Sequence, residues 1–412
     1  MASWIIVLGT TPNLALSELC ALFPSASFLQ LSSSCVLLEG ASDFSAEKLR
    51  DLAGGVVKIA EVVQTLPQVD AHVLAEIFLL LNPEPKIIFG VSRYDEGSVS
   101  ISFLAEIKDL LEKAGKHARF IEGKHGTLSS VVVEKQDVDE LVIAKKDGAY
   151  LVGITRAVQD FEAWNKRDYG RPYADPKAGM LPPKVARMAV NIAVGSLYSS
   201  SEESSTSREV QGNSSRQART IAVLDPFCGM GTILGEALLR GCRVIGSDQS
   251  KDVIAKAEAN LRWLSLQYRD IDALNIQLFV SDATHISEKV PPASVDAIVT
   301  EPFMGTTRLG GNDTLRLRSG QAFQMANDKL KNTIKGLEKL YIGCLKDWRR
   351  VLKPLGKVVI ALPQYAIGPK TYFVKKVVDN CENFGYTRLV GPIEYSRPQA
   401  VVKREFFVFQ KT

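Results

Sequence analysis

The sequence predicts an α/β protein whose C-terminal half is a mostly parallel, doubly wound sheet. From residue 220 onward, apolar segments of strand length alternate with segments of helical periodicity, as in parallel sheets whose strands are joined by helices. A Ser-rich stretch, residues 196–220, separates this half from a less regular N-terminal half. Several of the C-terminal strands end in a carboxylate, at the edge where open α/β sheets bind their ligands.

Composition sets the broad class. The 412 residues are 46% hydrophobic and 23% charged, which is typical of a globular protein with two or three domains. No run approaches the roughly 18 apolar residues that span a bilayer, and the first residues lack the pattern of a signal peptide. Six cysteines and four histidines show no ligand spacing. We therefore expect a cytoplasmic protein without metal or membrane partner, and the net charge of +4 permits nucleic acid without demanding it.

The expected elements of the C-terminal half follow from the same periodicity. The strands are expected at 220–227, 242–248, 276–283, 295–302 and 356–362, with a terminal hairpin from 386–395 and 402–410, and the helices at 232–240, 252–267 and 332–353. The N-terminal half mixes short strands with helices, which suggests α+β units used as accessory binding domains.

A glycine-containing turn, "LDPFCGMGTI" (224–233), is the strongest local motif. The first strand ends at Asp225, and Gly229 and Gly231 bracket a turn into a helix. Glycines let the backbone approach a ligand closely. The spacing is not G-x-G-x-x-G, which weakens a dinucleotide interpretation, and a tight turn without any ligand is the alternative.

Three more carboxylates end successive strands: Asp248, Asp282 and Glu301. Asp248 is positioned to accept hydrogen bonds from ribose hydroxyls, and Asp282 lies where its neighbourhood would contact an adenine. Each alone would be an ordinary strand-end cap. Together with Asp225 they form a register that favours a nucleotide-like cofactor.

The motifs "DPFCGMGT", "GSDQS", "VSDAT" and "TEPFMG" resemble those of class I S-adenosylmethionine-dependent methyltransferases, in the branch that modifies exocyclic amines of nucleobases. The resemblance implies S-adenosylmethionine as cofactor and a Rossmann-like sheet of seven strands with a C-terminal antiparallel hairpin. The implied cofactor-binding residues are Asp225, Pro226, Phe227, Gly229, Gly231, Thr232, Asp248, Asp282, Ala283 and Glu301. The implied catalytic residues are Glu301, Pro302 and Phe303, because the carboxylate and a carbonyl would accept the amine N–H groups and the ring would stack on the base.

The fourth motif departs from the family pattern, which has Asp or Asn, two prolines and an aromatic residue. Here Glu301 replaces the Asp or Asn, Phe303 stands at the second proline, and Met304 at the aromatic position. A longer side chain shifts the acceptor by about a bond length, and such misplacements cost on the order of 100-fold in rate. Either the loop is rebuilt around Glu301, or the substrate amine differs, or activity has been lost.

The segment "RDYGRPYADPKAGMLPPKVARMAVNIA" (167–193) resembles one in the tRNA guanosine-10 N2-methyltransferase family, as do "WIIVLGTTPNLALSELCALF", "FGVSRYD" and "EYSRPQAVVKREFFVF". The resemblance implies tRNA as partner, methyl transfer to the N2 amine of a guanosine at position 10, and leaves open a small activator subunit. The implied domains are a ferredoxin-like region at 1–65, a THUMP-like RNA-binding domain at 66–165, a connecting segment and helix at 166–197, a disordered linker or insertion at 198–219, and the methyltransferase domain at 220–412.

Basic residues cluster around the predicted RNA-binding half, where they would contact phosphates without reading sequence. The candidates are Lys116, Arg119, Lys124, Arg156, Lys166, Arg167 and Arg171. For any one of them a solvated surface position is an equal alternative. Residues 305–329 are either a lid carrying arginines or a disordered insertion, and the insertion is favoured.

Two other functions remain open at this point. One is a methyltransferase for adenine N6 or another nucleobase amine, and the other is a catalytically silent RNA-binding homologue. A dinucleotide oxidoreductase is disfavoured by the glycine spacing.

Overall fold

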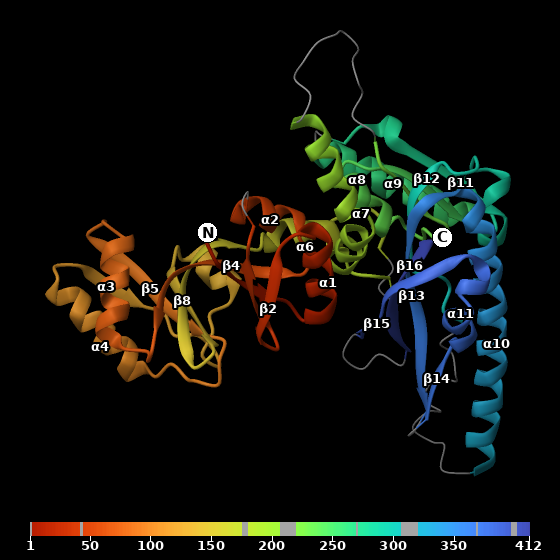
Figure 1. The fold of residues 1–412 in the computed structure, drawn as a ribbon. Coiled ribbons are helices and arrows are strands. Elements are labelled where there is room, and N and C mark those ends of the chain that lie inside the picture. Colours follow the sequence, from red (N-terminus) through yellow and green to blue (C-terminus); the bar gives the residue numbers. More distant parts are fainter. Residues whose placement is uncertain are drawn as a thin grey trace, which may run out of the picture. The chain divides into compact units, whose positions relative to one another are not determined.

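The computed structural model describes residues 2–41, 44–174, 180–206, 220–268, 271–305, 320–367, 370–396 and 402–412. The chain divides into two compact units, Met1–Asn165 and Lys166–Thr412. Each unit is built on its own eight-stranded sheet (Figure 1).

The N-terminal unit has a mixed sheet in the order β2-β3-β1-β4-β8-β7-β5-β6. The strands are β1 (Trp4–Leu8), β2 (Ser27–Ser32), β3 (Cys35–Glu39), β4 (Val56–Leu66), β5 (Lys86–Arg93), β6 (His117–Phe120), β7 (Asp139–Lys146) and β8 (Ala149–Val158). The helices are α1 (Pro12–Leu22), α2 (Ala46–Leu52), α3 (Ala71–Leu81), α4 (Ile101–Lys113), α5 (Ser130–Lys135) and α6 (Phe161–Tyr169), the last of which ends in the second unit. Strand β4 pairs with both β1 and β8, so the predicted regions 1–65 and 66–165 share one continuous sheet.

A buried ion pair joins the middle strands of this sheet. The side chains of Lys58 and Glu140 are 1% and 0% exposed and contact each other directly. Lys58 also donates to the carbonyl of Leu128 at 2.7 Å, and Glu140 accepts from the hydroxyls of Ser92 and Thr155. Since buried charges are tolerated only when paired and hydrogen-bonded, this network fixes the register of β4, β5, β7 and β8.

The C-terminal unit has the sheet order β11-β10-β9-β12-β13-β16-β15, with β14 paired beside β13. The strands are β9 (Ala222–Asp225), β10 (Arg243–Asp248), β11 (Ile276–Val280), β12 (Val295–Thr300), β13 (Leu352–Ile367), β14 (Lys370–Phe373), β15 (Tyr386–Tyr395) and β16 (Val402–Lys411). Strands β9 to β13 run parallel, whereas β14, β15 and β16 are antiparallel. The expected parallel sheet with a terminal hairpin is confirmed, and β14 is an eighth strand that the sequence did not reveal.

The helices of this unit are α7 (Pro183–Thr206), α8 (Thr232–Leu238), α9 (Lys251–Gln267), α10 (Gly320–Val351) and α11 (Lys375–Asp379), with 3₁₀ helices η2 (Ala273–Asn275), η3 (Ala283–Glu288) and η5 (Glu382–Phe384). Helix α8 contacts both α7 and α9, while α10, the long blue helix of Figure 1, contacts η3 and β13. The core beneath α10 includes Tyr341, Trp348 and Phe407. Among the described residues, no helix is long and apolar enough to cross a bilayer.

Two segments differ from the sequence-based expectation. Helix α10 begins at Gly320 instead of residue 332, so it includes part of the predicted insertion after the fourth motif. Helix α7 extends to Thr206, into the segment 198–219 that the sequence predicts as a disordered linker. Residues 207–219 and 306–319, which hold the rest of both predictions, lie outside the described residues.

Candidate active site

The acidic strand ends meet at one edge of the C-terminal sheet. Strands β9, β10 and β12 are parallel neighbours, so Asp225, Asp248 and the residue after Thr300 lie at the same edge. The hydroxyl of Thr300 donates to the carboxylate of Asp225 at 2.7 Å, which ties the ends of β9 and β12 together. The expected register of carboxylates therefore exists.

The turn from β9 into α8 is built around two left-handed glycines. Gly229 has φ of +49° and Gly231 has φ of +82°, backbone conformations that disfavour any residue with a Cβ. A Cβ on Gly229 would meet nothing within 4 Å, so open space adjoins the loop there. The N–H of Cys228 donates to the carbonyl of Ser247 at 2.9 Å, which holds the turn against β10. Such a turn suits a ligand that approaches the backbone closely.

Asp225 is directed into the protein. It is 1% exposed, and its Oδ1 accepts from the Thr300 hydroxyl and from the N–H of Phe227 at 3.1 Å. Burial raises the pKa of Asp225 to about 7, and the charges of Glu301 and Asp248 act in the same direction. Its carboxyl group therefore braces the glycine turn from the buried side. Phe227 likewise packs edge-on against Trp348, with 6.3 Å between ring centroids, and Pro226 is buried.

Asp248 and Asp282 both use one carboxylate oxygen to organise the turn that follows their strand. Oδ1 of Asp248 accepts the N–H of Ser250 at 3.0 Å. Oδ1 of Asp282 accepts the N–H and the hydroxyl of Thr284, both at 2.8 Å, and these bonds lower the pKa of Asp282. Asp248 is half-buried and Asp282 is exposed at the sheet edge. The neighbouring Ala283 is buried, and its carbonyl accepts from the indole N–H of Trp348 at 2.8 Å.

Glu301 lies directly beyond β12, and each of its carboxylate oxygens has a protein partner. Oε2 accepts the N–H of Leu181 at 3.1 Å, and Oε1 accepts from Nε of Arg404 in β16. The Glu301 side chain is 17% exposed and that of Arg404 is 10% exposed. Arg404 was missed by the sequence analysis, although one signal was present. It occupies an inward position of a strand whose alternate residues, Val402 and Phe406, are apolar, and a charge there requires a buried partner.

Two tyrosines hold the loop after Glu301. The hydroxyl of Tyr341 donates to the carbonyl of Phe303 at 2.6 Å, and that of Tyr365 donates to the carbonyl of Met304. Pro302 is buried, whereas the Phe303 side chain is exposed (55%). A fixed backbone therefore presents a large aromatic ring to solvent two residues after Glu301.

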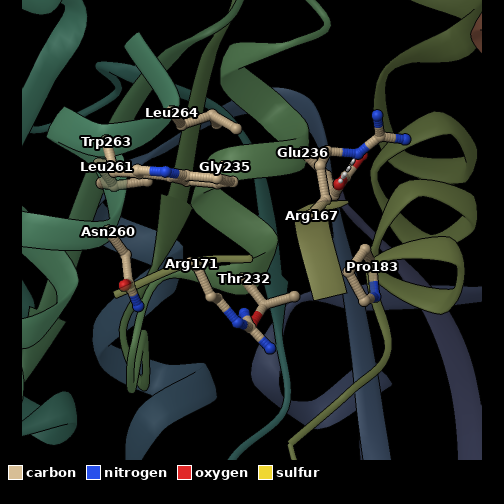
Figure 2. A pocket seen from close by; sticks show the side chains of 10 residues that line it. All are labelled: Arg167, Arg171, Pro183, Thr232, Gly235, Glu236, Asn260, Leu261, Trp263 and Leu264. Carbon is tan, nitrogen blue, oxygen red and sulfur yellow. Dashed lines mark hydrogen bonds and ion pairs between the residues drawn. The ribbon is translucent and has the colours of Figure 1, made fainter. Parts of the chain in front are cut away.

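Two arginines from the predicted RNA-binding set are engaged inside the C-terminal unit, around a pocket that α8 and α9 line (Figure 2). Arg167 donates to Glu236 at 3.0 Å and to the hydroxyl of Tyr268 at 3.2 Å. Arg171 donates to the hydroxyl of Thr232 at 2.6 Å, with its side chain 7% exposed. Arg187 of α7 contacts the same Glu236 at 2.8 Å. Because these guanidinium groups are buried and have protein partners, we leave Arg167 and Arg171 out of the proposed RNA-binding set.

Asn260 of α9 is a second residue that the sequence analysis missed. Its amide exchanges two hydrogen bonds with the backbone of Tyr173, both 2.9 Å. The same amide nitrogen donates to the carbonyl of Met230, also at 2.9 Å. Asn260 thus connects the segment before α7 to the glycine turn. No sequence pattern indicates this, since a polar residue in an amphipathic helix is ordinarily solvated.

The remaining basic candidates differ in their availability. Arg119, Lys124 and Lys166 are exposed. Lys116 donates to the carbonyls of Asn82 and Glu84, a capping role at the end of α3. Arg156 pairs with Glu61 at 2.8 Å and remains 41% exposed, so a phosphate would have to compete with that carboxylate.

Comparisons with known proteins agree with this geometry. Residues 218–399 match the sequence model of the family described as a methyltransferase domain. The chain is 29% identical over 166 residues to the tRNA (guanine(10)-N2)-dimethyltransferase of Pyrococcus abyssi. This aligned region covers 40% of this chain and 39% of that protein. It is 30% identical over 185 residues to the protein of the same name from Methanocaldococcus jannaschii, covering 43% and 44%. The matched region thus spans less than half the length of these relatives.

Among solved structures, the crystal structure of TrmN from Thermus thermophilus is similar over the whole of both chains, with a TM-score of 0.53 and 18% identity. This likeness concerns the fold. A methyltransferase domain of this kind takes its methyl group from S-adenosylmethionine, and the open glycine turn with Asp248 and Asp282 at its edge fits such a cofactor. Residues 218–399 of the C-terminal unit therefore match the family described as a methyltransferase domain, and the chain has a fold like that of TrmN.

Proposed function

We propose that the protein transfers a methyl group from S-adenosylmethionine to the exocyclic N2 amine of a guanosine in tRNA, at position 10. The observation that carries the proposal is the carboxylate of Glu301, which is fixed at the end of β12, two residues before the exposed Phe303. The domain that holds it is similar in sequence to two archaeal proteins named for that reaction.

The cofactor would lie along the carboxyl edge of β9, β10 and β11. In this arrangement the backbone from Gly229 to Thr232 contacts the methionine part, Asp248 accepts from the ribose hydroxyls, and Asp282 with Ala283 borders the adenine. Asp248 and Asp282 each use Oδ1 to accept a backbone N–H of the following turn. Since a carboxylate has about four acceptor positions in all, each retains acceptor positions for the cofactor. Asp225, Pro226 and Phe227 would support the turn from beneath.

The chemistry explains why an acceptor is needed at Glu301. An exocyclic amine is a poor nucleophile because its lone pair is delocalised into the ring. Acceptors that hold its N–H groups favour the pyramidal nitrogen that develops in the transition state. The Glu301 carboxylate and the Pro302 carbonyl are the candidate acceptors. When bound, S-adenosylmethionine supplies an electrophilic methyl group whose sulfonium leaves as a neutral thioether, and the methylated amine then releases one proton.

The N-terminal unit would bind the RNA, as ferredoxin-like and THUMP-like regions. Of the candidate basic residues, the exposed Arg119, Lys124 and Lys166 remain available for phosphates. Arg156 and Lys116 are secondary candidates because protein groups already engage them. Since an amine within a duplex is inaccessible, the target guanosine would be unpaired or flipped out.

The test is mass spectrometry of nucleosides after incubation of a tRNA transcript with the protein and methyl-labelled S-adenosylmethionine. We expect label on guanosine as an N2-methyl derivative. Label on adenosine would replace our proposal with the adenine-N6 alternative. Bound cofactor without any labelled nucleoside would favour the silent RNA-binding homologue.

Glu301→Ala tests the role of the carboxylate within the same assay. Loss of a preorganised group that acts on the transition state costs about 100- to 1,000-fold in rate, so we expect that loss with unchanged cofactor affinity by calorimetry. Asp252→Asn, on the exposed side of α9, is the matched control and should retain wild-type activity. A Glu301→Ala variant that methylates tRNA at the wild-type rate would remove Glu301 from the mechanism.

A further inference from the structure

Arg404 is an unusual residue for its strand. β16 lies between β13 and β15, and its neighbours Phe406, Phe407, Val408 and Phe409 are all buried. An arginine among them would be costly unless it had a specific partner. That partner is Glu301, which is 103 residues away in sequence.

Arg404 is fixed through its backbone by both neighbouring strands and through its guanidinium group by two side chains. Arg404 pairs in register with Pro363 of β13 and with Tyr395 of β15. Its guanidinium carbon lies 5.9 Å from the centre of the Tyr395 ring, within the range of a cation–π contact. Nε points to Oε1 of Glu301. Arg404 therefore has little freedom to follow Glu301 and acts as a fixed anchor for it.

The anchor determines the orientation of Glu301. Because an arginine remains protonated in proteins, Arg404 offers Oε1 a fixed, charged donor. The second oxygen is held separately by the N–H of Leu181. With its two oxygens fixed by different segments, the carboxylate plane is set before any substrate arrives.

A fixed carboxylate offers acceptors and no donor. The Watson–Crick edge of guanine presents two adjacent donors, N1–H and the N2 amine, which match the two oxygens of a carboxylate. The edge of adenine presents the N6 amine beside the acceptor N1, which matches an amide such as Asn or Gln. An oriented carboxylate thus favours guanine and repels adenine.

Resting on the function proposed above, we propose that Arg404 is a positioning residue that holds Glu301 as an oriented carboxylate and so makes this site specific for the donor edge of guanine. This arrangement accounts for the glutamate at a position where the family pattern has Asp or Asn. The longer side chain reaches Arg404, and that contact sets where its carboxylate lies.

The test uses the full-length protein and two tRNA transcripts, with guanosine or 2-aminopurine at the methylated position. 2-Aminopurine keeps the N2 amine and replaces N1–H by an acceptor. Wild type should prefer guanosine by about 100-fold or more in kcat/KM, because N1 of 2-aminopurine is an acceptor and would face a carboxylate oxygen instead of donating to it. Glu301→Gln, which can donate to N1, should shift that ratio toward 2-aminopurine by about 100-fold, whatever its absolute rate.

Arg404→Gln should lower kcat by about 100-fold, since Glu301 loses its anchor and misplacement is costly, while KM for tRNA and the affinity for S-adenosylmethionine stay unchanged. Arg404→Lys should restore part of the rate. In a Glu301→Gln background, Arg404→Gln should have no further effect, because the two residues act as one unit. Lys403→Gln is the control on the same strand: its side chain pairs with Glu394 at 2.9 Å and is 40% exposed, so kcat should not change.

Three results would overturn the inference: an unchanged kcat in Arg404→Gln, additive losses in the double variant, or a base preference that Glu301→Gln leaves as in wild type. If Arg404→Gln does not fold, the rate of Arg404→Lys and the base preference of Glu301→Gln still test the inference. Failure of the proposed function is distinguishable, since wild type would then bind S-adenosylmethionine and methylate neither transcript.

Discussion

Asp225 offers a quantitative test of the packing beneath the glycine turn between β9 and α8. The carboxyl group is buried and accepts hydrogen bonds from the Thr300 hydroxyl and the Phe227 N–H. In Asp225→Asn the amide oxygen can accept the same two bonds, but the side chain no longer ionises. The difference in stability between the variant and wild type should therefore depend on pH.

The sign and the size follow from linkage. Burial raises the pKa of Asp225 to about 7 in the folded chain, whereas an aspartate in an unfolded chain titrates at about 3.9. The stability that the protonated group contributes is thus fully present below about pH 4 and is lost as the pH rises through about 7. Between pH 5 and pH 8, wild type should lose about 2–3 kcal/mol of unfolding free energy relative to Asp225→Asn.

The assay is urea unfolding of both proteins at pH 5 and pH 8 without cofactor. Taking the difference between the two proteins cancels the other groups that titrate in this range. Asp282→Asn is the matched control: hydrogen bonds lower the pKa of Asp282, so the group is ionised in both states above pH 5 and its difference from wild type should stay constant. A constant difference for Asp225→Asn would show that its carboxyl is already ionised at pH 5 and would refute the reasoning.

Other substitutions probe the scaffold and the loop. Glu236→Gln leaves two buried guanidinium groups without their carboxylate and should lower the unfolding free energy by about 3–5 kcal/mol. Asp252→Asn breaks an exposed ion pair within α9 and should cost about 0.5 kcal/mol or less. Equal losses of unfolding free energy for Glu236→Gln and Asp252→Asn in denaturant titrations would contradict this reasoning. Gly231→Ala places a Cβ at φ of +82°, should cost about 1–2 kcal/mol, and should weaken S-adenosylmethionine binding by calorimetry, so undiminished affinity would count against the turn as the cofactor site. Tyr341→Phe removes the donor to the Phe303 carbonyl and should cost about 1 kcal/mol and slow methylation without changing cofactor affinity; a wild-type rate would mean that the loop does not need this bond.

The strands of the C-terminal sheet were predictable because their signals are local. Each parallel strand is an apolar run bounded by a turn, and a carboxylate at the end of β9, β10, β11 and β12 marks one edge. Strand β14 and the first turns of α10 were not predictable in this way. β14 has only four residues, and its pairing with the end of β13 is a tertiary contact that leaves no periodic signature.

Most of what could not be predicted from the sequence concerns which side chains contact each other in the folded protein. The basic character of Arg167 and Arg171 indicated phosphate binding, but charge alone does not distinguish a solvated arginine from one that is buried against Glu236 or Thr232. Asp225 was expected beside the cofactor and instead turns inward to Thr300. Glu301 was correctly placed at a strand end, while its partner Arg404 depends on strands that meet only in the folded sheet.

The position of β16 has a consequence for how the protein matures. This strand occupies the slot between β13 and β15, so both neighbours keep an unpaired edge until residues 402–411 have been synthesised. Ribosomes add about 5–20 residues per second, and for the interval between β15 and β16 the exposed edges can recruit foreign strands. Because Arg404 arrives with β16, Glu301 gains its anchor only when that strand is in place. The parallel strands β9 to β12 are therefore synthesised well before the partner of Glu301.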